Sequence, residues 1–357
     1  MMRLDDREWK PISISHYFFF IRGRENNMAT LEDGDTPLIS ARSVNNGLKG
    51  FVNTPKKIVG GNCISLNNDG DGGAGLAYYQ PFDMALDTHV TALVPKIEMS
   101  KYTMLFIAEC LSKLHGFFGH GLSISNPRAE KIRILLPVTD EGTPDFQFMN
   151  EYMSELEKIK RKQYRVYIEK RLKSLGLDFT NRGGDSKLLK SQKWQSFTIK
   201  DIADVYSGHD IYAQARIDGN TPLVTAVGIN NGIGYFVGND NDSRAEGSIS
   251  VVRNGASVGK AFYHRYSALY GNDCRRMKLK NTDSEFASLF ITQVIWMQNK
   301  AFSYSRKLGT ERLENLRIML PVTGDSEPDY GFMEFFGRKL MSHKYNQYLD
   351  FLASDTI

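Results

Sequence analysis

The chain has 357 residues, 41% of them hydrophobic, so it can bury a sizeable core, and its length predicts two or three domains rather than one. Its longest apolar runs, residues 17–21 and 133–138, are far shorter than the roughly 20 residues of a membrane-spanning helix, and no apolar signal segment follows the first residues. These features exclude a bundle of membrane helices and lead us to expect a soluble, cytoplasmic protein, whereas the net charge of +4 excludes neither an enzyme nor a binding protein.

The cysteines give no sign of a metal centre or a disulfide framework. Cys63, Cys110 and Cys274 are odd in number, far apart in the sequence and without the paired spacing of a zinc site. We therefore expect thiols buried as small apolar groups, and no metal in this chain.

An internal repeat organises the sequence. Residues 34–52 (GDTPLISARSVNNGLKGFV) align with residues 219–237 (GNTPLVTAVGINNGIGYFV) at an offset of 185, which also places Trp9 on Trp194 and Gly23 on Gly208. Further along, RILLPVT at 133–139 recurs as RIMLPVT at 317–323, now at an offset of 184. Two collinear blocks with nearly one offset predict a duplicated unit.

Each copy contains the same elements in the same order. A strand led by the tryptophan and a Gly-rich region precede short strands separated by Gly, Asn and Asp turns, expected in the first copy at 37–41, 50–52, 63–66, 75–79 and 90–94. A helix follows at 102–113 or 285–298, and then an apolar strand that ends at Pro137 or Pro321. A closing helix follows a Pro-Asp pair, in which Asp145 or Asp329 is the expected N-cap.

The closing helices are long. In the first, apolar residues recur at alternating steps of three and four over residues 147–175, a length of roughly 40 Å at 1.5 Å per residue. Such a stripe is typical of helices that pair with one another, although each helix could instead pack on its own domain. The positions that we assign to this spacer and partner-docking stripe are Met149, Tyr152, Leu156 and Ile159 in the first helix and Met333, Phe336, Leu340 and Tyr348 in the second.

The predicted class is α+β, a tandem duplication of a strand-rich domain followed by a long helix. The expected boundaries are 1–145 for the first domain, 146–178 for its helix, 179–329 for the second domain and 330–357 for its helix.

This order of elements resembles the specificity (S) subunits of type I restriction-modification systems and the related subunits of type IIB systems. The residues that carry the resemblance are Gly208, residues 221–223 (TPL), 230–232 (NNG) and 302–304 (FSY) leading to 317–323, with their first-copy counterparts. The resemblance implies two target recognition domains, each reading half of a split site in double-stranded DNA, and an antiparallel coiled coil of the two long helices. It also implies a non-catalytic chain without a cofactor of its own. Its partners would be methyltransferase or fused nuclease-methyltransferase subunits that use S-adenosylmethionine and Mg²⁺.

General geometry agrees with that picture. A duplicated unit closed by an antiparallel helix pair acquires a pseudo-two-fold axis, and two-fold DNA readers engage half-sites roughly 34 to 36 Å apart, close to the length of the predicted helix. Because the copies differ outside their common elements, we expect the two half-sites to differ in sequence.

Base edges are read by Arg or Lys at guanine, Asn or Gln at adenine, and Ser or Thr at either. Loop residues of these types are our candidates for DNA binding. In the first copy they are Arg42, Ser43, Asn45, Asn46, Lys49, Asn67 and Asn68; in the second they are Asn230, Asn231, Arg244, Arg253, Asn254, Lys260 and Arg265, with Arg306 and Lys307 as phosphate contacts. Residues 253–280 carry seven basic side chains against one acid, which suits a phosphate backbone or, alternatively, a solvated basic face.

The Asn-Asn-Gly segments have a second interpretation. They occupy the same place in both copies, so they cannot by themselves explain the reading of two different half-sites. A turn that uses positive φ would account for them equally well. Positions that differ between the copies, such as Arg42 against Val227 and Lys49 against Gly234, are better candidates for specificity.

No catalytic constellation is apparent. The Gly-rich run 70–75 aligns with residues 254–259 and favours a turn between strands over a nucleotide-binding loop. The Asn or Asp, Pro, Pro and aromatic sequence that amino-methyltransferases need is absent, no acid-x-Lys strand follows the Pro-Asp pairs, and His115 and His120 have no counterparts in the second copy.

Two other classes of function remain open. A hydrolase or nuclease with one active site between the repeats would need a carboxylate pair or a metal site. A duplicated protein-interaction module would have no nucleic acid partner, and salt-dependent binding to duplex DNA would argue against it.

Overall fold

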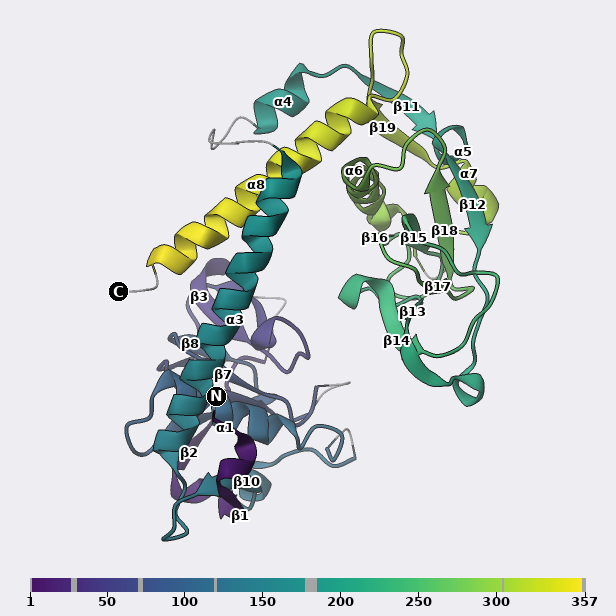
Figure 1. Ribbon diagram of the computed structural model, residues 1–357. Helices are drawn as coiled ribbons and strands as arrows, with labels where there is room; N and C mark the ends of the chain where they lie inside the picture. Colours follow the sequence, from purple (N-terminus) through teal and green to yellow (C-terminus); the bar gives the residue numbers. More distant parts are fainter. Residues whose placement is uncertain are drawn as a thin grey trace. The chain divides into compact units, whose positions relative to one another are not determined.

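The computed structural model describes residues 2–26, 31–69, 73–118, 121–176, 185–303 and 305–354. The chain divides into two compact units, unit 1 (residues 1–164) and unit 2 (residues 165–357), each of which contains sheets and helices (Figure 1). No helix in the described ranges is both long and apolar enough to cross a membrane.

Unit 1 contains three sheets. The first, which is antiparallel, has the order β2 (Phe18–Arg22), β9 (Val90–Pro95), β6 (Cys63–Asn67) and β7 (Ala77–Gln80). The second has the order β4 (Leu48–Val52), β3 (Asp33–Ile39), β8 (Met84–Leu86) and β5 (Ile58–Val59), with β3 and β8 parallel. The third pairs β1 (Glu8–Ser13) with β10 (Arg133–Val138). The helices are α1 (Lys101–Ser112), α2 (Asn126–Ala129) and α3 (Phe146–Leu175), which continues into unit 2.

Unit 2 repeats this topology. Its first sheet has the order β12 (Ala203–Ser207), β18 (Cys274–Leu279), β15 (Ser248–Val252) and β16 (Ala261–His264). Its second has the order β14 (Ile233–Val237), β13 (Asp218–Val224) and β17 (Leu269–Tyr270), and its third pairs β11 (Trp194–Thr198) with β19 (Arg317–Pro321). The helices are α4 (Asp185–Ser191), α5 (Ile199–Ile202), α6 (Glu285–Trp296), α7 (Thr310–Glu314) and α8 (Tyr330–Ser354). The predicted α+β duplication is confirmed.

The core of each unit lies between a helix and the first sheet. In unit 1, Met104, Ile107 and Leu111 of α1 are buried against Ile64 and Leu93 of that sheet. In unit 2, α6 contributes Ala287, Ile291 and Ile295 to the equivalent cluster. Full burial of each large aliphatic side chain contributes about 1.5–3 kcal/mol, so this contact is a principal source of stability in both units.

The two tryptophans that lead the copies occupy equivalent places. Trp9 stacks on Phe106 with ring centroids 5.9 Å apart, and Trp194 stacks on Phe290 at 6.3 Å. Each indole N–H donates to a main-chain carbonyl five residues earlier. The repeated tryptophan is therefore part of the domain scaffold.

The predicted N-caps of the long helices are confirmed. Asp145 Oδ1 accepts a hydrogen bond from Phe148 N at 2.9 Å, and Asp329 Oδ1 accepts one from Phe332 N at 2.8 Å. Burial alone would raise the pKa of Asp145, but the hydrogen bonds from the Arg7 guanidinium and from Phe148 N hold that pKa below its ordinary value.

The end of α3 packs against α8 within unit 2. Tyr167 lies edge-on to Tyr345, with ring centroids 6.4 Å apart, and Arg338 donates to the carbonyl of Leu175 at 3.2 Å. Residue numbers rise along α3 as they fall along α8, so the two helices run antiparallel here. This contact is consistent with the predicted helix pair.

Several residues of the predicted stripe nevertheless pack on the domains and not on the other long helix. Met149 and Met333 are fully buried in the cores of their own units, and Phe336 packs edge-on against Phe290. The expectation that these positions form the helix pair was therefore wrong. They lie in the first turns of the helices, where the domain is the nearest apolar surface.

The remaining positions of the stripe divide differently. Tyr348 packs with the cluster formed by α3 and α8, as predicted. Tyr152 is partly buried against the core of unit 1, Leu156 and Ile159 are partly buried on α3, and Leu340 is 40% exposed. Residues 177–184 and 355–357, where the predicted helix boundaries fall, lie outside the described residues.

The cysteine thiols behave as small apolar groups at two positions. Cys63 and Cys274 are buried, and burial raises the pKa of each thiol to about 12. Cys110 is partly buried, and burial also raises its pKa to about 12. All three are unbonded to one another and poor nucleophiles.

Candidate nucleic-acid interface

Equivalent loops meet at one end of the first sheet in each unit. In unit 1, Asn67 at the end of β6 lies opposite Val90 at the start of β9. In unit 2, Val252 at the end of β15 lies opposite Cys274 at the start of β18. The loops that follow β6 or β15 and precede β9 or β18 are therefore neighbours, and we call this part of each unit the loop end.

Main-chain hydrogen bonds fix the loop end in the same way in both units. In unit 1, Asn68 N donates to His89 O at 2.8 Å, and Ile124 N donates to Asn68 O at 2.7 Å. The counterparts in unit 2 are the bonds from Arg253 N to Asp273 O, at 2.9 Å, and from Leu308 N to Arg253 O, at 3.0 Å. The backbone is thus conserved between the copies while the side chains on it differ.

The Asn-Asn-Gly segments form turns with positive φ. The φ angles are 54°, 49° and 79° at Asn45, Asn46 and Gly47, and 50°, 56° and 74° in the corresponding residues 230–232. The structural interpretation of these segments is therefore confirmed. Asn46 O accepts a hydrogen bond from Gln80, which helps to hold the turn, whereas the Asn45 side chain is exposed.

The equivalent turn in unit 2 lies along β16. Asn231 Nδ2 donates to Tyr263 O at 3.2 Å and to Tyr266 Oη at 3.0 Å, so this amide is engaged within the unit. Asn230 is exposed, as Asn45 is, and both stay candidates for a DNA contact.

Two of the unit 1 candidates lie together. Arg42 and Lys49 line a cavity of about 690 Å³ at the loop end, and Arg42 Nη1 donates to Leu48 O at 3.2 Å. The same cavity is lined by Asp69 and His89, whose Oδ1 and Nδ1 atoms lie 2.6 Å apart. Ser43 is exposed nearby in sequence.

Two other unit 1 candidates are buried. The Asn67 amide donates to Arg42 O at 3.0 Å and to Gly73 O at 3.2 Å, and it therefore ties two loops together. Asn68 is also fully buried, and its side-chain atoms have no partner among the described residues. The prediction that these amides reach base edges was wrong, because the loops fold over the end of β6. Residues 70–72 of the Gly-rich run lie outside the described residues.

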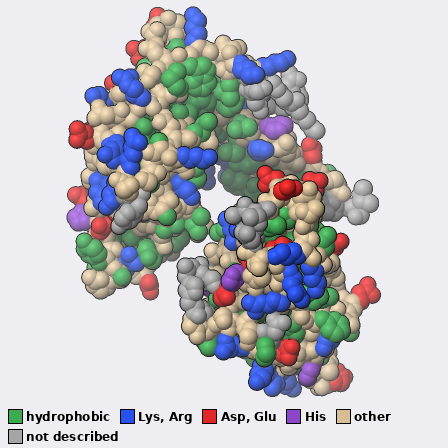
Figure 2. All heavy atoms as spheres, turned by 180° about the vertical axis from the view of Figure 1, so that it is seen from behind, with side chains coloured by type: hydrophobic (Ala, Val, Ile, Leu, Met, Phe, Trp, Pro, Cys, Tyr) green, Lys and Arg blue, Asp and Glu red, His purple; other side chains and the backbone are tan. Residues whose placement is uncertain are grey.

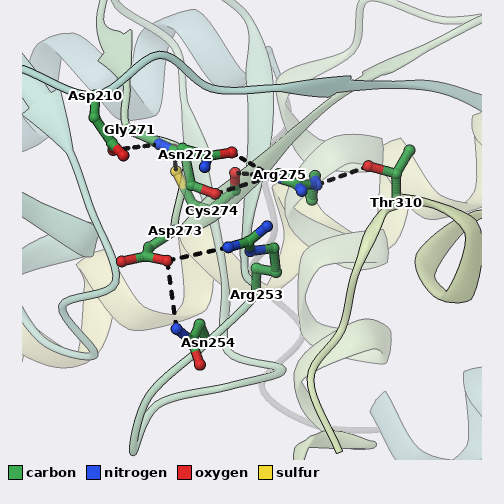
Figure 3. A network of polar contacts seen from close by, with 9 residues as sticks. All are labelled: Asp210, Arg253, Asn254, Gly271, Asn272, Asp273, Cys274, Arg275 and Thr310. Atoms are coloured by element: carbon green, nitrogen blue, oxygen red, sulfur yellow. Dashed lines mark hydrogen bonds and ion pairs between the residues drawn. The ribbon is translucent and has the colours of Figure 1, made fainter.

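In unit 2 the candidates Arg253, Asn254 and Lys307 meet at the loop end. Arg253 Nη2 and Asn254 Nδ2 each lie 3.5 Å from Asp273 Oδ1 (Figure 3). Arg253 and Lys307 line one cavity of about 710 Å³. Arg306 is exposed in the adjoining loop.

Lys260 also belongs to this end of the sheet. Its ammonium group donates to Gly228 O at 3.1 Å and lies 5.6 Å from the centroid of the Trp296 ring. The side chain therefore joins the turn after β13 to α6, and it is only partly exposed. The aligned run 254–259 is a turn between β15 and β16, as predicted, with positive φ at Gly255 and Gly259.

Arg244 and Arg265 lie elsewhere. Ser248 pairs with His264 at the opposite end of β15 from Val252, so Arg265 follows β16 far from the loop end. Arg244 Nε donates to Asp240 Oδ1 at 2.6 Å, and Ala245 bridges to Ala268. The structure therefore separates these two arginines from the other candidates.

Sequence reasoning missed a pair of equivalent arginines. Arg128 and Arg312 each donate through Nη1 to the main-chain oxygen of the residue five positions earlier, Ser123 or Lys307. Both are exposed at the loop end. The signal was available, because the offset of 184 that aligns the LPV strands also aligns these two arginines.

The surface charge is distributed in small groups. On the face drawn in Figure 2, Lys and Arg side chains lie in separate clusters among neutral and acidic atoms. Among the described residues, no three His, Cys, Asp or Glu side chains lie close enough together to hold a metal ion. His115 Nδ1 donates a hydrogen bond to Ala74 O, 2.9 Å away, while His120 and Tyr304 lie outside the described residues.

Comparison with known proteins identifies the duplicated unit. The type I restriction modification DNA specificity domain matches residues 7–164 and again residues 191–348. The chain is 29% identical over 334 residues to the specificity subunit S.BcgI of a type II restriction enzyme from Heyndrickxia coagulans, covering 92% of this chain and 93% of that protein.

Two solved structures are also similar along most of the chain. An S subunit of a type I restriction-modification system from M. genitalium has a TM-score of 0.48 and 15% identity, with 99% of this chain and 94% of the other covered. The HsdS subunit from Thermoanaerobacter tengcongensis has a TM-score of 0.32 and 12% identity, with 95% and 91% covered. Because the two domain matches span most of the sequence, the chain belongs to the type I restriction modification DNA specificity domain family and is a specificity subunit of a restriction-modification system with two recognition domains.

Proposed function

We propose that this chain reads a bipartite sequence in double-stranded DNA, one half-site with each unit, and directs partner subunits to it. The observation that carries the proposal is the loop end, where the two units share a main-chain framework and differ in the side chains displayed on it. The DNA backbone is the same in every sequence, so the shared main-chain framework can contact it in the same way in both units. The bases differ between the half-sites, so reading them requires different side chains.

This function needs some residues that both units share and other residues that differ between the units. Arg128 and Arg312 lie at the same place in both units, and an exposed arginine is suited to a phosphate, which every sequence presents. Arg42 and Lys49 are found only in unit 1, and Arg253 and Lys307 only in unit 2. These residues are suited to reading different half-sites.

The partners proposed are methyltransferase subunits, or subunits that fuse a methyltransferase to a nuclease. The relative S.BcgI is named as the specificity subunit of a type II restriction enzyme, and the match covers nearly its whole length. In this proposal the partner binds S-adenosylmethionine and, where it cleaves DNA, Mg²⁺. Leu340, exposed on α8, stays a candidate for partner docking.

The test is co-expression with the cognate modification subunit, followed by modification-sensitive sequencing of the host DNA. We expect adenine methylation at two different half-sites that are separated by a fixed number of base pairs. Methylation that ignores sequence, or none in spite of a stable complex, would refute the proposal.

A further inference from the structure

Two arginines lie side by side at the loop end of unit 2, and they are held in different ways (Figure 3). Arg275, on β18, is 5% exposed; its Nε donates to Thr310 Oγ1 at 2.8 Å and its Nη1 to Asn272 O at 2.9 Å. Burial, and then the neighbouring charge of Arg253, lower the pKa of this guanidinium. Arg275 is therefore a fixed structural cation behind the surface.

Arg253 has a fixed backbone and a guanidinium with donors to spare. Main-chain bonds to Asp273 and Leu308 hold the residue on both sides. Its Nη2 lies 3.5 Å from Asp273 Oδ1, a long contact, and its Nε is buried and has no partner within the described ranges. The side chain is about one quarter exposed, at 26%, and lines the 710 Å³ cavity. The planar guanidinium of Arg253 therefore lies at the cavity wall, where only one of its N–H groups is held within the part of the chain that the structure describes, by the long contact with Asp273.

The lining of that cavity favours a ligand rich in hydrogen-bond acceptors. Lys307 and Arg312 line it together with Arg253, Thr310 and Asn315, and Glu311 is the one acid among the lining residues. On DNA, two groups fit such donors: the phosphate oxygens, and the O6 and N7 atoms of guanine in the major groove.

Comparison of the two units separates these possibilities. By their places in the sheet, the counterparts of Arg253 and Arg275 in unit 1 are Asn68 and Thr91, which are neutral and buried. Phosphates are the same in both half-sites, so a phosphate contact at this place would be expected in both units, as it is for Arg128 and Arg312. A charge found in one copy alone fits a base that occurs in one half-site alone.

We propose that Arg253 reads a guanine in the half-site bound by unit 2, with its guanidinium donating to O6 and N7. Asp273 holds one edge of the fork, and the Arg275–Thr310 pair supports the strand beside it. The proposal rests on the proposed function and adds to it a named residue, a named base and a named half-site.

To test this proposal, the methylation motif is determined by modification-sensitive sequencing for two complexes, one with Arg253→Gln and one with Arg253→Lys. For Arg253→Gln we expect discrimination at one guanine to fall roughly 5- to 150-fold, while the other half-site is unchanged. Arg253→Lys should retain part of the preference, because an ammonium can still donate to O6 and N7 but lacks the planar fork of the guanidinium. Arg317→Gln is the matched control, since Arg317 is an exposed arginine of the same unit on β19, outside the loop end, and the methylation motif of this variant should equal that of the wild type.

A second measurement needs no variant and so does not depend on folding. The wild-type complex is bound to duplexes in which each guanine of the motif is replaced in turn by 7-deazaguanine, which lacks the N7 acceptor. Affinity should fall at one guanine of the unit 2 half-site, and in the Arg253→Gln complex that same replacement should have no further effect.

The outcomes separate the two proposals. If the wild-type complex methylates a bipartite site and Arg253→Gln leaves every base preference intact, Arg253 does not read a base, while the proposed function stands. A uniform loss of affinity with a salt slope reduced by about one would identify a phosphate contact and also overturn the inference. A wild-type complex without sequence preference overturns both.

Discussion

Substitution of Gly208 by alanine tests how the loop end of unit 2 is held. A Cβ atom at Gly208 would lie 2.1 Å from Gly271 O and 2.4 Å from Tyr270 O, far inside the closest approach of real Cβ atoms. Both obstacles are main-chain atoms of the segment that leads to Asp273, so no side-chain rotation can relieve the overlap. The backbone must move.

The expected cost is large for a single methyl group. Overpacking in well-packed regions costs about 1–3 kcal/mol, and here the contact is with backbone, so we expect Gly208→Ala to lower the free energy of unfolding of unit 2 by about 2–4 kcal/mol. Gly23→Ala should do the same in unit 1, where the Cβ would lie 2.0 Å from Asp87 O. Movement of residues 271–273 should also weaken recognition of the unit 2 half-site, because Asp273 contacts Arg253.

Hydrogen exchange measured by mass spectrometry reports on each unit separately. Protection should fall in unit 2 for Gly208→Ala and in unit 1 for Gly23→Ala. Gly324→Ala is the control, since a Cβ there meets nothing within 4 Å, and it should change stability by less than about 0.5 kcal/mol. If Gly208→Ala were as mild as Gly324→Ala, the close approach would not constrain the loop end.

Three further predictions concern a buried histidine, a helix N-cap and the length of α3. His264 is buried and its pKa is lowered to about 4, so the free energy of unfolding of unit 2 should be highest above pH 6.5 and should fall by up to about 3 kcal/mol as the pH falls toward 4. The variant His264→Gln, which copies Gln80 of unit 1, should abolish this loss in urea titrations. Asp145→Ala should cost about 1–2 kcal/mol in thermal unfolding, through the lost N-cap and the unpaired Arg7; an unchanged melting temperature would contradict this. Four residues inserted between Lys160 and Gln163 lengthen α3 by about 6 Å, so the spacer in the methylated site should grow by about two base pairs; an unchanged spacer would show that α3 does not set it.

The polar pair that contains His264 has a counterpart in unit 1. In unit 2 the His264 ring lies 2.8 Å from Ser250 Oγ, and in unit 1 Gln80 Nε2 donates to Ser65 Oγ at 2.9 Å. The same strand pair thus joins the same two positions with different polar groups. Of these two groups only the histidine is ionisable, so only unit 2 should respond to pH at this place.

The duplication, the family and the caps could be predicted from the sequence because they rest on local or periodic signals. Asp145 and Asp329 follow proline at the start of an apolar stripe, and each carboxylate lies within reach of the amide of the third helical residue. The same reasoning found the Asn-Asn-Gly turns, since asparagine and glycine tolerate positive φ. The family match confirms the prediction of a non-catalytic recognition subunit.

Burial of polar residues could not be predicted in the same way. Asn67 and Asn68 look like exposed turn residues in the sequence, yet β6 extends through Asn67 and the adjoining loops cover both side chains. Arg275 is likewise buried on a strand, where its Nε donates to Thr310, which is distant in sequence, and its Nη1 donates to the carbonyl of nearby Asn272. These outcomes depend on tertiary contacts that no local pattern contains.

In the proposed function, the way the loop end is held lets one scaffold read two sequences. Its position is set by main-chain hydrogen bonds, Asn68 N to His89 O in unit 1 and Arg253 N to Asp273 O in unit 2, and these bonds are indifferent to the side chain that the residue carries. The buried asparagine of unit 1 and the partly exposed arginine of unit 2 therefore occupy the same main-chain framework, and only the arginine presents donors at the surface. Specificity can then change in one half-site at a time, because each unit has its own core and its own loop end.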